Sequence, residues 1–411
     1  MISSKDIQEI LKSYDLDNLT IGVLGGHSAL DVCAGAKKHG FKTLAVCQKG
    51  REKTYSKYFK TRDAQDRAGE MIGCVDDVLL VDKFSDIVKP ENQKYLRDRN
   101  TVFVHNRYFW VYFKDFSNIE NDFMVPIFGT RDMLKLEERD QPKNQYYLLQ
   151  KAGIRIPKIF KKPEDIDRLV IVKVNEATRG YERAFFKAAS FEEYKAKSAD
   201  MIAKKVITKE ALDKAVIEEF VIGAQVNFNY FYSPFAGEVE LLGTDTRRQT
   251  NLDGLLRLPA WEQMDLHDLN FEPKIIENGH YAVTTKESLL EKILDIGEKF
   301  VKATQAEHAH GIIGPFALQG AIIAEEGKED IVIFDVSLRI PGSPGTRFTP
   351  YTGYLYGQDI SVGERVAMEI AEGVKRGKLG KLLTGYSSEN LIYEDNFTCR
   401  RKKCSNAANR G

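Results

Sequence analysis

The most informative part of this sequence is Phe316-Ala-Leu-Gln319, followed after a polar turn by Ile331-Val-Ile-Phe-Asp335-Val-Ser337-Leu-Arg339-Ile340. Both segments predict β-strands, and the side chains of a strand alternate between its two faces. The alternation places five apolar residues on one face: Val332, Phe334, Val336, Leu338 and Ile340. It leaves Asp335, Ser337 and Arg339 on the other face. Such a polar row is costly unless it meets a ligand, an ion or solvent.

The turn between the two segments indicates which residues face each other. Gln319 and Asp335 each lie eight positions from Gly327. If the hairpin is symmetric about Gly327, these two residues face each other. Directly opposed residues have Cβ atoms about 5 Å apart. A carboxylate and an amide oxygen at that separation suit a hard cation such as Mg²⁺, and Arg339 could contact a phosphate. The spacing fits a solvent-facing edge with an aspartate–arginine pair equally well.

A lysine interrupts the apolar run Val170-Ile-Val-Lys173-Val174, which predicts a buried strand. The polar loop that follows, Asn175–Arg183, could fold over phosphates. In the alternative interpretation Lys173 reaches the surface, because its apolar stem lets the ammonium extend to water.

A second strand runs from Ala215 into Glu218, Glu219 and then Val221. Such a segment can offer backbone hydrogen bonds to an adenine, and carboxylates to its amino group and to ribose hydroxyls. The alternative is a strand end with solvated acids. A row of amides follows on one face of the next strand: Gln225, Asn227 and Asn229. This row again suggests a polar ligand.

Composition narrows the class of protein. The chain has 411 residues, which predicts two or three packed units. Lys+Arg and Asp+Glu both total 60, so a nucleic-acid binder with a globally basic surface is not expected. No apolar run is long enough for a membrane span and the polar N-terminus is not a secretory signal, so we expect a cytoplasmic protein. The five cysteines form no CxxC pair and are expected to be free thiols.

The order of predicted elements divides the chain into four parts. Alternating strands and a helix over residues 19–48 start a parallel α/β domain, placed at 1–125. A smaller α+β unit is placed at 126–215, and long strands with one amphipathic helix fill 216–398. The basic, polar segment 399–411 is expected to be a solvated tail.

In this order, the lysine strand, polar loop, Glu-Glu-Phe-Val segment and late hairpin resemble the ATP-grasp superfamily, with a Rossmann-like domain in front. A narrower resemblance covers roughly residues 15–375. It rests on these motifs: Leu24-Gly-Gly-His-Ser28, Asn106-Arg-Tyr-Phe109, Val125-Pro-Ile-Phe-Gly-Thr-Arg131, Glu137-Glu-Arg139, Leu149-Gln-Lys-Ala-Gly-Ile-Arg-Ile-Pro157 and Phe334-Asp-Val-Ser-Leu-Arg-Ile340. They look like the archaeal formate-dependent synthetase of purine biosynthesis. That family makes 5-formaminoimidazole-4-carboxamide ribonucleotide (FAICAR) from the 5-amino nucleotide (AICAR), formate and ATP.

The resemblance implies a role for individual residues. The family's nucleotide-contacting histidine falls on His27, at a strand end ahead of a helix N-terminus that suits an anion. A further contact with AICAR falls on Asn251. The family's metal pair falls on Gln319 and Asp335, with Mg²⁺ or Mn²⁺ as the expected ion. The ATP lysine falls on Lys173. The adenine-binding segment spans Glu218, Glu219 and Val221, and Arg339 joins Lys173 in offsetting charge during catalysis.

Three features depart from the family pattern: one loop and two single residues. The phosphate-binding loop is usually rich in glycine, whereas residues 175–185 contain only Gly180. Tyr108 replaces a substrate-contacting serine, and Asp335 replaces a glutamate. These changes leave two alternatives open: an ATP-grasp ligase for another acid or amine, and a non-catalytic nucleotide-binding paralogue. Small-molecule substrates and a homo-oligomer are expected, without nucleic acid or membrane partners.

Overall fold

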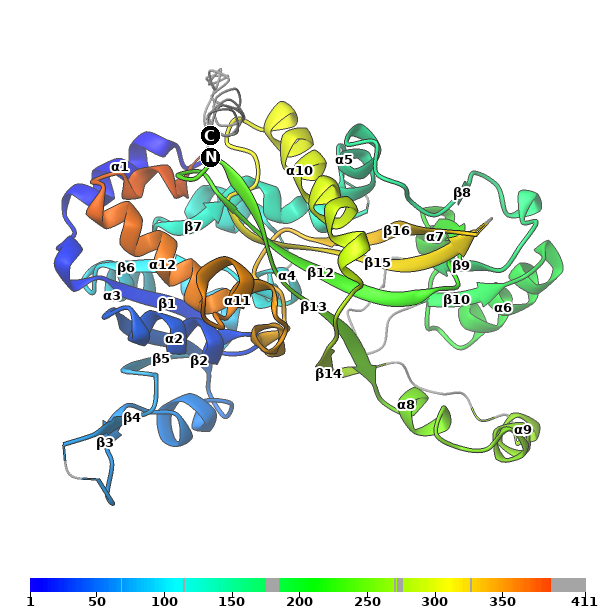
Figure 1. The fold of residues 1–411 in the computed structure, drawn as a ribbon, viewed down its shortest axis with the longest axis horizontal. Coiled ribbons are helices and arrows are strands. Elements are labelled where there is room, and N and C mark those ends of the chain that lie inside the picture. Colours follow the sequence, from blue (N-terminus) through cyan, green and yellow to red (C-terminus); the bar gives the residue numbers. More distant parts are fainter. Residues whose placement is uncertain are drawn as a thin grey trace, which may run out of the picture.

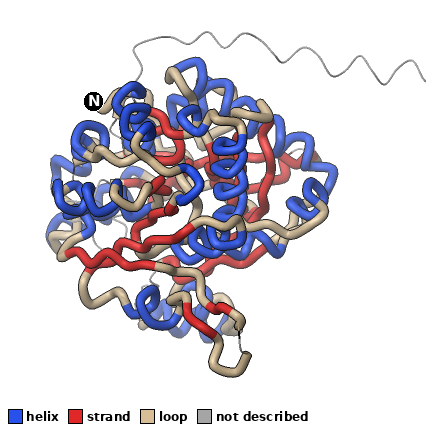
Figure 2. The backbone as a smooth tube through the Cα atoms, turned by 90° about the vertical axis from the view of Figure 1, so that its left-hand side faces the viewer, coloured by secondary structure: helices blue, strands red, loops and turns tan. Residues whose placement is uncertain are grey.

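The computed structural model of this chain describes residues 1–67, 69–113, 115–139, 141–174, 185–269, 271, 276–325 and 327–385, with the backbone alone at 110 and 344. The predicted phosphate loop, apart from Phe185, and the predicted tail at 399–411 lie outside these residues. Figures 1 and 2 show three main sheets with helices around them. Within the described part, no helix is both long enough and apolar enough to cross a membrane.

A six-stranded parallel sheet forms one end of the molecule, on the left of Figure 1, with strand order β17-β7-β6-β1-β2-β5. The strands are β1 (Thr20–Leu24), β2 (Lys42–Gln48), β5 (Asp77–Val81), β6 (Thr101–Val104), β7 (Ile127–Thr130) and β17 (Leu383–Thr384). Strand β1 is buried throughout, as expected for a parallel strand covered on both faces. The predicted strand–helix–strand start is confirmed, with α2 at Ala29–Lys38.

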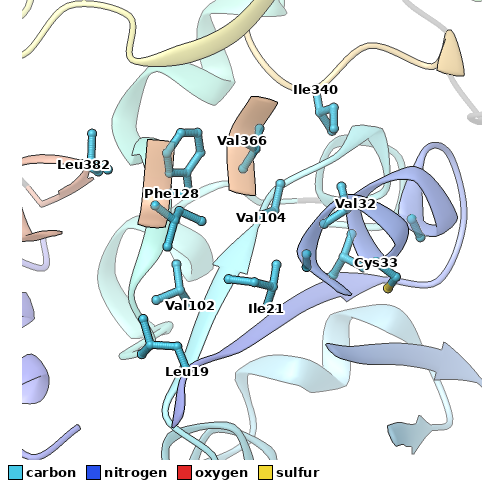
Figure 3. Close-up of a cluster of buried hydrophobic side chains, with 14 of the residues drawn as sticks. Leu19, Ile21, Val32, Cys33, Val102, Val104, Phe128, Ile340, Val366 and Leu382 are labelled. Atoms are coloured by element: carbon cyan, nitrogen blue, oxygen red, sulfur yellow. The ribbon is translucent and has the colours of Figure 1, made fainter. Parts of the chain in front are cut away.

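The core of this sheet includes the C-terminal part of the chain. Figure 3 shows side chains of β1 and β6 packed with residues from far along the sequence. The labelled residues are Leu19, Ile21, Val32, Cys33, Val102, Val104, Phe128, Ile340, Val366 and Leu382. Helix α12 (Val362–Lys375) crosses α2 so closely that a Cβ on Gly35 would lie 2.4 Å from the Glu364 backbone. This contact requires glycine and fixes the two helices together.

The smaller unit is an antiparallel sheet with strand order β10-β9-β11-β8. Its strands are β8 (Ile159–Phe160), β9 (Val170–Lys173), β10 (Phe185–Ala188) and β11 (Val216–Glu219). Helix α5 (Gln145–Lys151) precedes the sheet, and α6 (Phe191–Ala203) and α7 (Lys209–Asp213) lie between β10 and β11. The side chain of Ser190 caps α6 by accepting a hydrogen bond from Glu193 N.

A five-stranded antiparallel sheet joins the two ends, with strand order β14-β13-β12-β15-β16. Its strands are β12 (Ala224–Ser233), β13 (Glu238–Gln249), β14 (Glu277–Ala282), β15 (Gly314–Glu325) and β16 (Lys328–Ser337). The predicted amphipathic helix is confirmed as α10 (Leu290–Glu307), which lies across one face of this sheet. Its Ile293 and Phe300 are buried against Tyr230 and Phe316.

The remaining elements lie around these sheets. They are α1 (Ser4–Lys12), α3 (Pro90–Arg97), α4 (Arg107–Tyr112), α8 (Leu252–Leu255), α9 (Ala260–Asp268), α11 (Tyr351–Tyr356), and the short strands β3 (Arg62–Asp63) and β4 (Met71–Ile72). Helices α8 and α9 form an arm that projects from the end of β13 (Figure 1).

The sheets do not follow the predicted boundaries. Strand β7 lies beyond residue 125 and still belongs to the first sheet, and so does β17 near the C-terminal end of the described chain. Strand β11 lies beyond residue 215 and belongs to the smaller sheet. Strand pairing depends on neighbours in space, so apolar patterns along the sequence could not show these memberships.

The predicted alternation along β16 is wrong for its first half. Ile331 and Ile333 share the α10 core with Val336 and Leu338, whereas Val332 and Phe334 belong to a separate cluster on the opposite face. A β-bulge between the pairs Gln319↔Asp335 and Gly320↔Ile333 causes this switch. One extra residue in a bulge reverses the faces of all residues beyond it.

Candidate functional site

Four polar residues form a straight row across four strands of the central sheet. The register pairs Asp245 with Asn227, Asn227 with Gln319, and Gln319 with Asp335. The amides of Asn227 and Asn229 each donate to Asp245, at 2.7 Å. The predicted opposition of Gln319 and Asp335 is therefore confirmed, and the predicted amide row lies in the same place.

The bulge is what brings the pair together. The turn pairs Glu325 with Lys328, and a regular ladder from that pair would place Gln319 opposite Phe334. The extra residue moves Asp335 into register with Gln319 instead. The symmetric hairpin assumed from the sequence gives the same pair, although the real hairpin is not symmetric.

Gln319 and Asp335 are both held by arginines. Arg247 Nη2 donates to the amide oxygen of Gln319, whose amide nitrogen lies 3.3 Å from Ser337 Oγ. Arg139 Nη2 lies 3.2 Å from Asp335 Oδ1. Two oxygen donors on neighbouring strands fit Mg²⁺, which takes its other ligands from water and phosphates. Among the residues that the structure describes, no cluster of three His, Cys, Asp or Glu could hold a metal alone.

Lys173 is buried rather than extended to the surface, so that alternative is wrong. Its side chain is 7% exposed and forms an ion pair with Glu218 on the neighbouring strand β11. Its ammonium also donates to the Tyr146 hydroxyl at 3.1 Å and to the Phe334 carbonyl at 3.2 Å. Burial lowers the pKa of Lys173, and Glu218 opposes that shift.

The two glutamates of the predicted adenine segment point in different directions. Glu218 is 1% exposed and binds Lys173 and the Tyr146 hydroxyl, so it is not a solvated strand end. Glu219 faces outward, where its carboxylate lies 3.4 Å from Arg168. Their opposite directions follow from strand alternation. Glu218 thus positions the lysine, a role that its sequence context did not reveal.

An apolar surface lies next to Lys173. Val221 and Phe334 pack together against the buried residues Ala321, Ile323 and Val332. The ammonium of Lys173 lies 5.9 Å from the centre of the Phe334 ring. A flat apolar surface beside a cation suits a purine base joined to phosphates. Val221, which the sequence predicted to bind adenine, belongs to this surface, whereas Phe334 and Tyr146 were not predicted as site residues.

His27 joins the first domain to the end of the hairpin. It follows β1 in a left-handed conformation, φ 34°, and Ser28 after it has φ 73°. Its ring lies against Gly342, where a Cβ would be 2.1 Å from His27 Cε1. Burial and the nearby charges of Arg339 and Arg107 lower the pKa of His27 to about 3. The imidazole is therefore neutral near pH 7 and can donate a hydrogen bond without carrying charge.

Arg339 lies on the His27 side of the site rather than beside Lys173. Its Nε is 3.5 Å from a Glu137 oxygen, and its charge lowers the pKa of both His27 and Arg107. The Nε atoms of Arg107 and Arg339 are buried without a hydrogen-bond partner among the described residues. Cations with unused donors suit an anionic ligand.

A charged histidine completes this side. His280 contacts Asp245 through Nδ1 and lies 2.8 Å from Glu277 through Nε2. Burial alone would lower its pKa, but hydrogen bonds to these two carboxylates raise the pKa of His280 to about 9. His280 is therefore a cation near pH 7. The sequence carried no signal for it, because Asp245 lies on another strand and Glu277 lies across an irregularity in the pairing of β14 with β13.

Tyr108 lies directly against the His27 loop. A Cβ on Gly26 would be 2.2 Å from the Tyr108 ring, and that ring packs on Phe84 with a centroid distance of 5.0 Å. The amide of Asn106 holds the loop by donating to the carbonyls of Leu24 and Gly26. A cavity of about 490 Å³ opens beside the loop. Its lining includes His27, Ser28, Tyr55, Arg347 and Phe348.

Asn251 lies just beyond the end of β13. It is exposed, has φ 58° and precedes α8 at the base of the arm (Figure 1). The other two residues predicted to contact the substrate, His27 and Tyr108, lie on and against the loop after β1, and no described contact links Asn251 to them.

Two family models match the chain. A "Protein of unknown function (DUF1246)" covers residues 21–160 and a "Domain of unknown function (DUF1297)" covers residues 193–384. Among the curated relatives are two proteins named 5-formaminoimidazole-4-carboxamide-1-(beta)-D-ribofuranosyl 5'-monophosphate synthetase. The one from Methanocaldococcus jannaschii is 37% identical over 93% of this chain and 100% of its own length. The one from Methanothermobacter thermautotrophicus is 38% identical over 93% of this chain and 99% of its own length.

Solved structures confirm the predicted ATP-grasp fold. An IMP biosynthesis protein PurP from Thermococcus kodakaraensis superposes with a TM-score of 0.63, at 24% identity, over 89% of this chain and 100% of its own. An N5-carboxyaminoimidazole synthetase from Staphylococcus aureus, solved with ADP, gives a TM-score of 0.54 at 12% identity. This likeness covers 90% of this chain and 78% of the synthetase. Both likenesses extend across the N-terminal sheet and the two sheets that follow it.

Proposed function

The chain belongs to the family of 5-formaminoimidazole-4-carboxamide ribonucleotide synthetases, and from this premise we propose that it formylates AICAR with formate and ATP. It is an ATP-dependent carbon–nitrogen ligase with an ATP-grasp fold. Formate attacks the terminal phosphorus of ATP, which releases ADP and forms formyl phosphate. The amine of AICAR then attacks the formyl carbon, loses a proton and releases phosphate. The product FAICAR serves IMP biosynthesis.

We assign adenine-nucleotide binding to the part of the smaller sheet that carries Lys173. Lys173 offers a buried ammonium to a phosphate, which then replaces Glu218 as its main partner. Val221 and Phe334 offer the apolar surface for the base, while Glu219 is the carboxylate nearer to solvent. Glu218 keeps the lysine charged and oriented through Tyr146.

Gln319 and Asp335 would hold a divalent cation, Mg²⁺ or Mn²⁺. A cation there supplies charge neutralisation for the phosphate oxygens during transfer. Arg339 lies beside Glu137 and near His27, and we assign to its guanidinium the role of offsetting charge on the transferred group. Catalysis by these residues consists of positioning and exclusion of water, since acyl phosphates hydrolyse readily.

The AICAR nucleotide is assigned to the His27 loop. The cavity beside it, the N-terminus of α2 and the cations Arg107 and Arg339 together suit a ribonucleotide monophosphate. Tyr108 forms the wall of this site at Gly26. Asn251, just beyond the end of β13, is retained as a candidate contact with the nucleotide.

The observation that carries the proposal is the row Asp245–Asn227–Gln319–Asp335, which ends beside buried Lys173. The test is a coupled assay of ADP release with purified protein. Release is expected only with ATP, formate and AICAR together, with FAICAR formed in equal amount. ADP release that does not depend on AICAR, or none at all, contradicts the proposal.

Tyr108 favours one alternative, a ligase that joins another acid and amine. The ring occupies space that a serine would leave open against Gly26, which narrows the site. A screen of carboxylates and amino nucleotides in the same assay decides between the two. A non-catalytic paralogue is the outcome if no pair supports ADP release.

We also propose that the protein is a homo-oligomer. Helices α8 and α9 bury none of their described residues, and Trp261 and Met264 are 68% and 67% exposed. A short helix without packing is marginal in water, so a second copy is the natural partner for the arm. Light scattering after size exclusion should give a multimer that Trp261→Glu/Met264→Glu converts to smaller species; a monomeric wild type contradicts this.

A further inference from the structure

Two arginines from different elements contact the Gln319–Asp335 pair. Arg247 comes from β13 and binds Gln319, whereas Arg139 approaches the outer edge of β16 and binds Asp335 at 3.2 Å. The segment around Arg139 is fixed on that edge by two side chains. Glu137 accepts a hydrogen bond from Leu338 N, and Gln145 accepts one from Val336 N, both at 2.7 Å.

Both guanidinium groups have unused donors. The side chains of Arg139 and Arg247 are only 16% and 20% exposed. The Nε atom of each is buried without a hydrogen-bond partner among the described residues. Arg247 Nε does lie 3.0 Å from a Glu277 oxygen, but outside hydrogen-bond geometry. Since a guanidinium presents five donors in a rigid fork, each arginine keeps a donor that the described residues do not satisfy.

The sequence gives a reason why such donors are needed. Loops that bind phosphates through backbone N–H groups rely on glycines for close approach. Residues 175–185 contain one glycine, Gly180. Charged side chains elsewhere in the site are then the natural donors to the phosphate oxygens.

We propose that Arg139 and Arg247 form a clamp for the terminal phosphoryl group of ATP. In the ligand-free protein each arginine neutralises or orients one residue of the pair. If a cation binds Gln319 and Asp335, the guanidinium groups of the two arginines no longer need to bind these residues. They can then donate hydrogen bonds to the phosphoryl oxygens. This inference rests on the proposed ATP and metal site, and it adds two phosphate-binding residues to it.

The test compares ADP with the non-hydrolysable β,γ-imido analogue of ATP by calorimetry, both with Mg²⁺. Wild-type protein is expected to bind the analogue more tightly than ADP. Arg139→Met and Arg247→Met should each weaken analogue binding about 10- to 100-fold and leave ADP binding unchanged. Arg155→Met is the matched control, because Arg155 pairs with Glu325 and Asp330 at the far end of the same hairpin.

A second readout separates a clamp from a structural role. Removing the Arg139 cation should increase the affinity of nucleotide-free protein for Mn²⁺, measured by electron paramagnetic resonance, since Asp335 loses a competing partner. A variant that merely damages the fold weakens Mn²⁺, ADP and the analogue together, and that result overturns the proposal. If Arg139→Met does not fold, Arg139→Lys should fold and bind the analogue with intermediate affinity.

The clamp and the proposed function can fail separately. If the ratio of analogue affinity to ADP affinity is the same in both methionine variants as in the wild type, the clamp is contradicted. This holds even if the protein formylates AICAR. A changed ratio in a protein that does not formylate AICAR supports the clamp and contradicts the proposed substrate.

Discussion

Lys173 shows how one buried side chain links two strands and a helix. It lies on β9, its carboxylate partner Glu218 on β11, and the hydroxyl that contacts both on Tyr146 of α5. Neither charge is stable alone in this environment, because a buried ion without a partner is strongly unfavourable. In the proposed ATP site, a phosphate would replace Glu218 as the partner of Lys173.

Lys173→Met should lower the free energy of unfolding by about 3–5 kcal/mol, because it leaves Glu218 charged and buried. Adding Glu218→Gln should restore most of that stability without restoring ATP affinity. Urea unfolding and calorimetry with ATP measure the two effects. The assignment is wrong if the double variant binds ATP like the wild type, or if the single variant is fully stable.

Asp335→Asn should lower turnover about 100-fold at limiting Mg²⁺ while the melting temperature changes little. The amide can still accept a hydrogen bond from Arg139 but is a weaker metal ligand. Asp330→Asn on the same hairpin is the control, since Asp330 pairs with Arg155 and Lys292 near the turn. Wild-type turnover of Asp335→Asn would remove Asp335 from the metal site.

At the scale of elements, the bulge in β16 and the loop after β1 position the site. The opposition of Gln319 and Asp335 could be predicted because both lie on apolar strands joined by a short turn. The bulge itself could not, since no residue type signals it, and the face of Phe334 was therefore predicted wrongly. The partner of Lys173 was also hidden, because Glu218 is adjacent only through strand pairing.

Gly342→Ala tests how the hairpin end positions the β1 loop. A Cβ there would lie 2.1 Å from His27 Cε1, so the imidazole must move. We expect the KM for AICAR to rise about 10- to 100-fold with the KM for ATP unchanged. Gly279→Ala is the control, since a Cβ at Gly279 meets nothing within 4 Å. Equal increases in both constants would indicate general damage, and no increase would mean that His27 does not contact AICAR.

At the scale of the whole molecule, the first sheet encloses residues from both ends of the chain. The strands of residues 19–48 and the long later strands could be predicted from apolar patterns. The return of α12 and β17 to the first sheet could not, since short segments such as Leu383–Thr384 carry no pattern. Gly342 and Arg339, which follow the hairpin, lie near His27 of the first sheet.

Stability should depend on pH through the histidines of this junction. The folded pKa of His280, about 9, exceeds its unfolded value of about 6.5, so its contribution is complete below pH 6.5 and lost as pH rises through 9. The folded pKa of His27 is about 3, so the unfolded state binds its proton more readily and stability falls as pH drops below 6.5. Urea unfolding between pH 5 and 10 should show a maximum near pH 6.5–7. In His280→Gln, the decrease in the free energy of unfolding at alkaline pH should be smaller by about 3 kcal/mol. An unchanged decrease would contradict the charged state of His280.

Oxygen-18 in formate shows whether the protein activates formate as formyl phosphate. Attack on the terminal phosphorus makes a formate oxygen the bridging atom, and that oxygen leaves with phosphate when the AICAR amine attacks the formyl carbon. Mass spectrometry of the phosphate released from ¹⁸O-labelled formate, ATP and AICAR should therefore find one labelled oxygen for each FAICAR formed. Unlabelled phosphate alongside FAICAR would contradict activation through formyl phosphate.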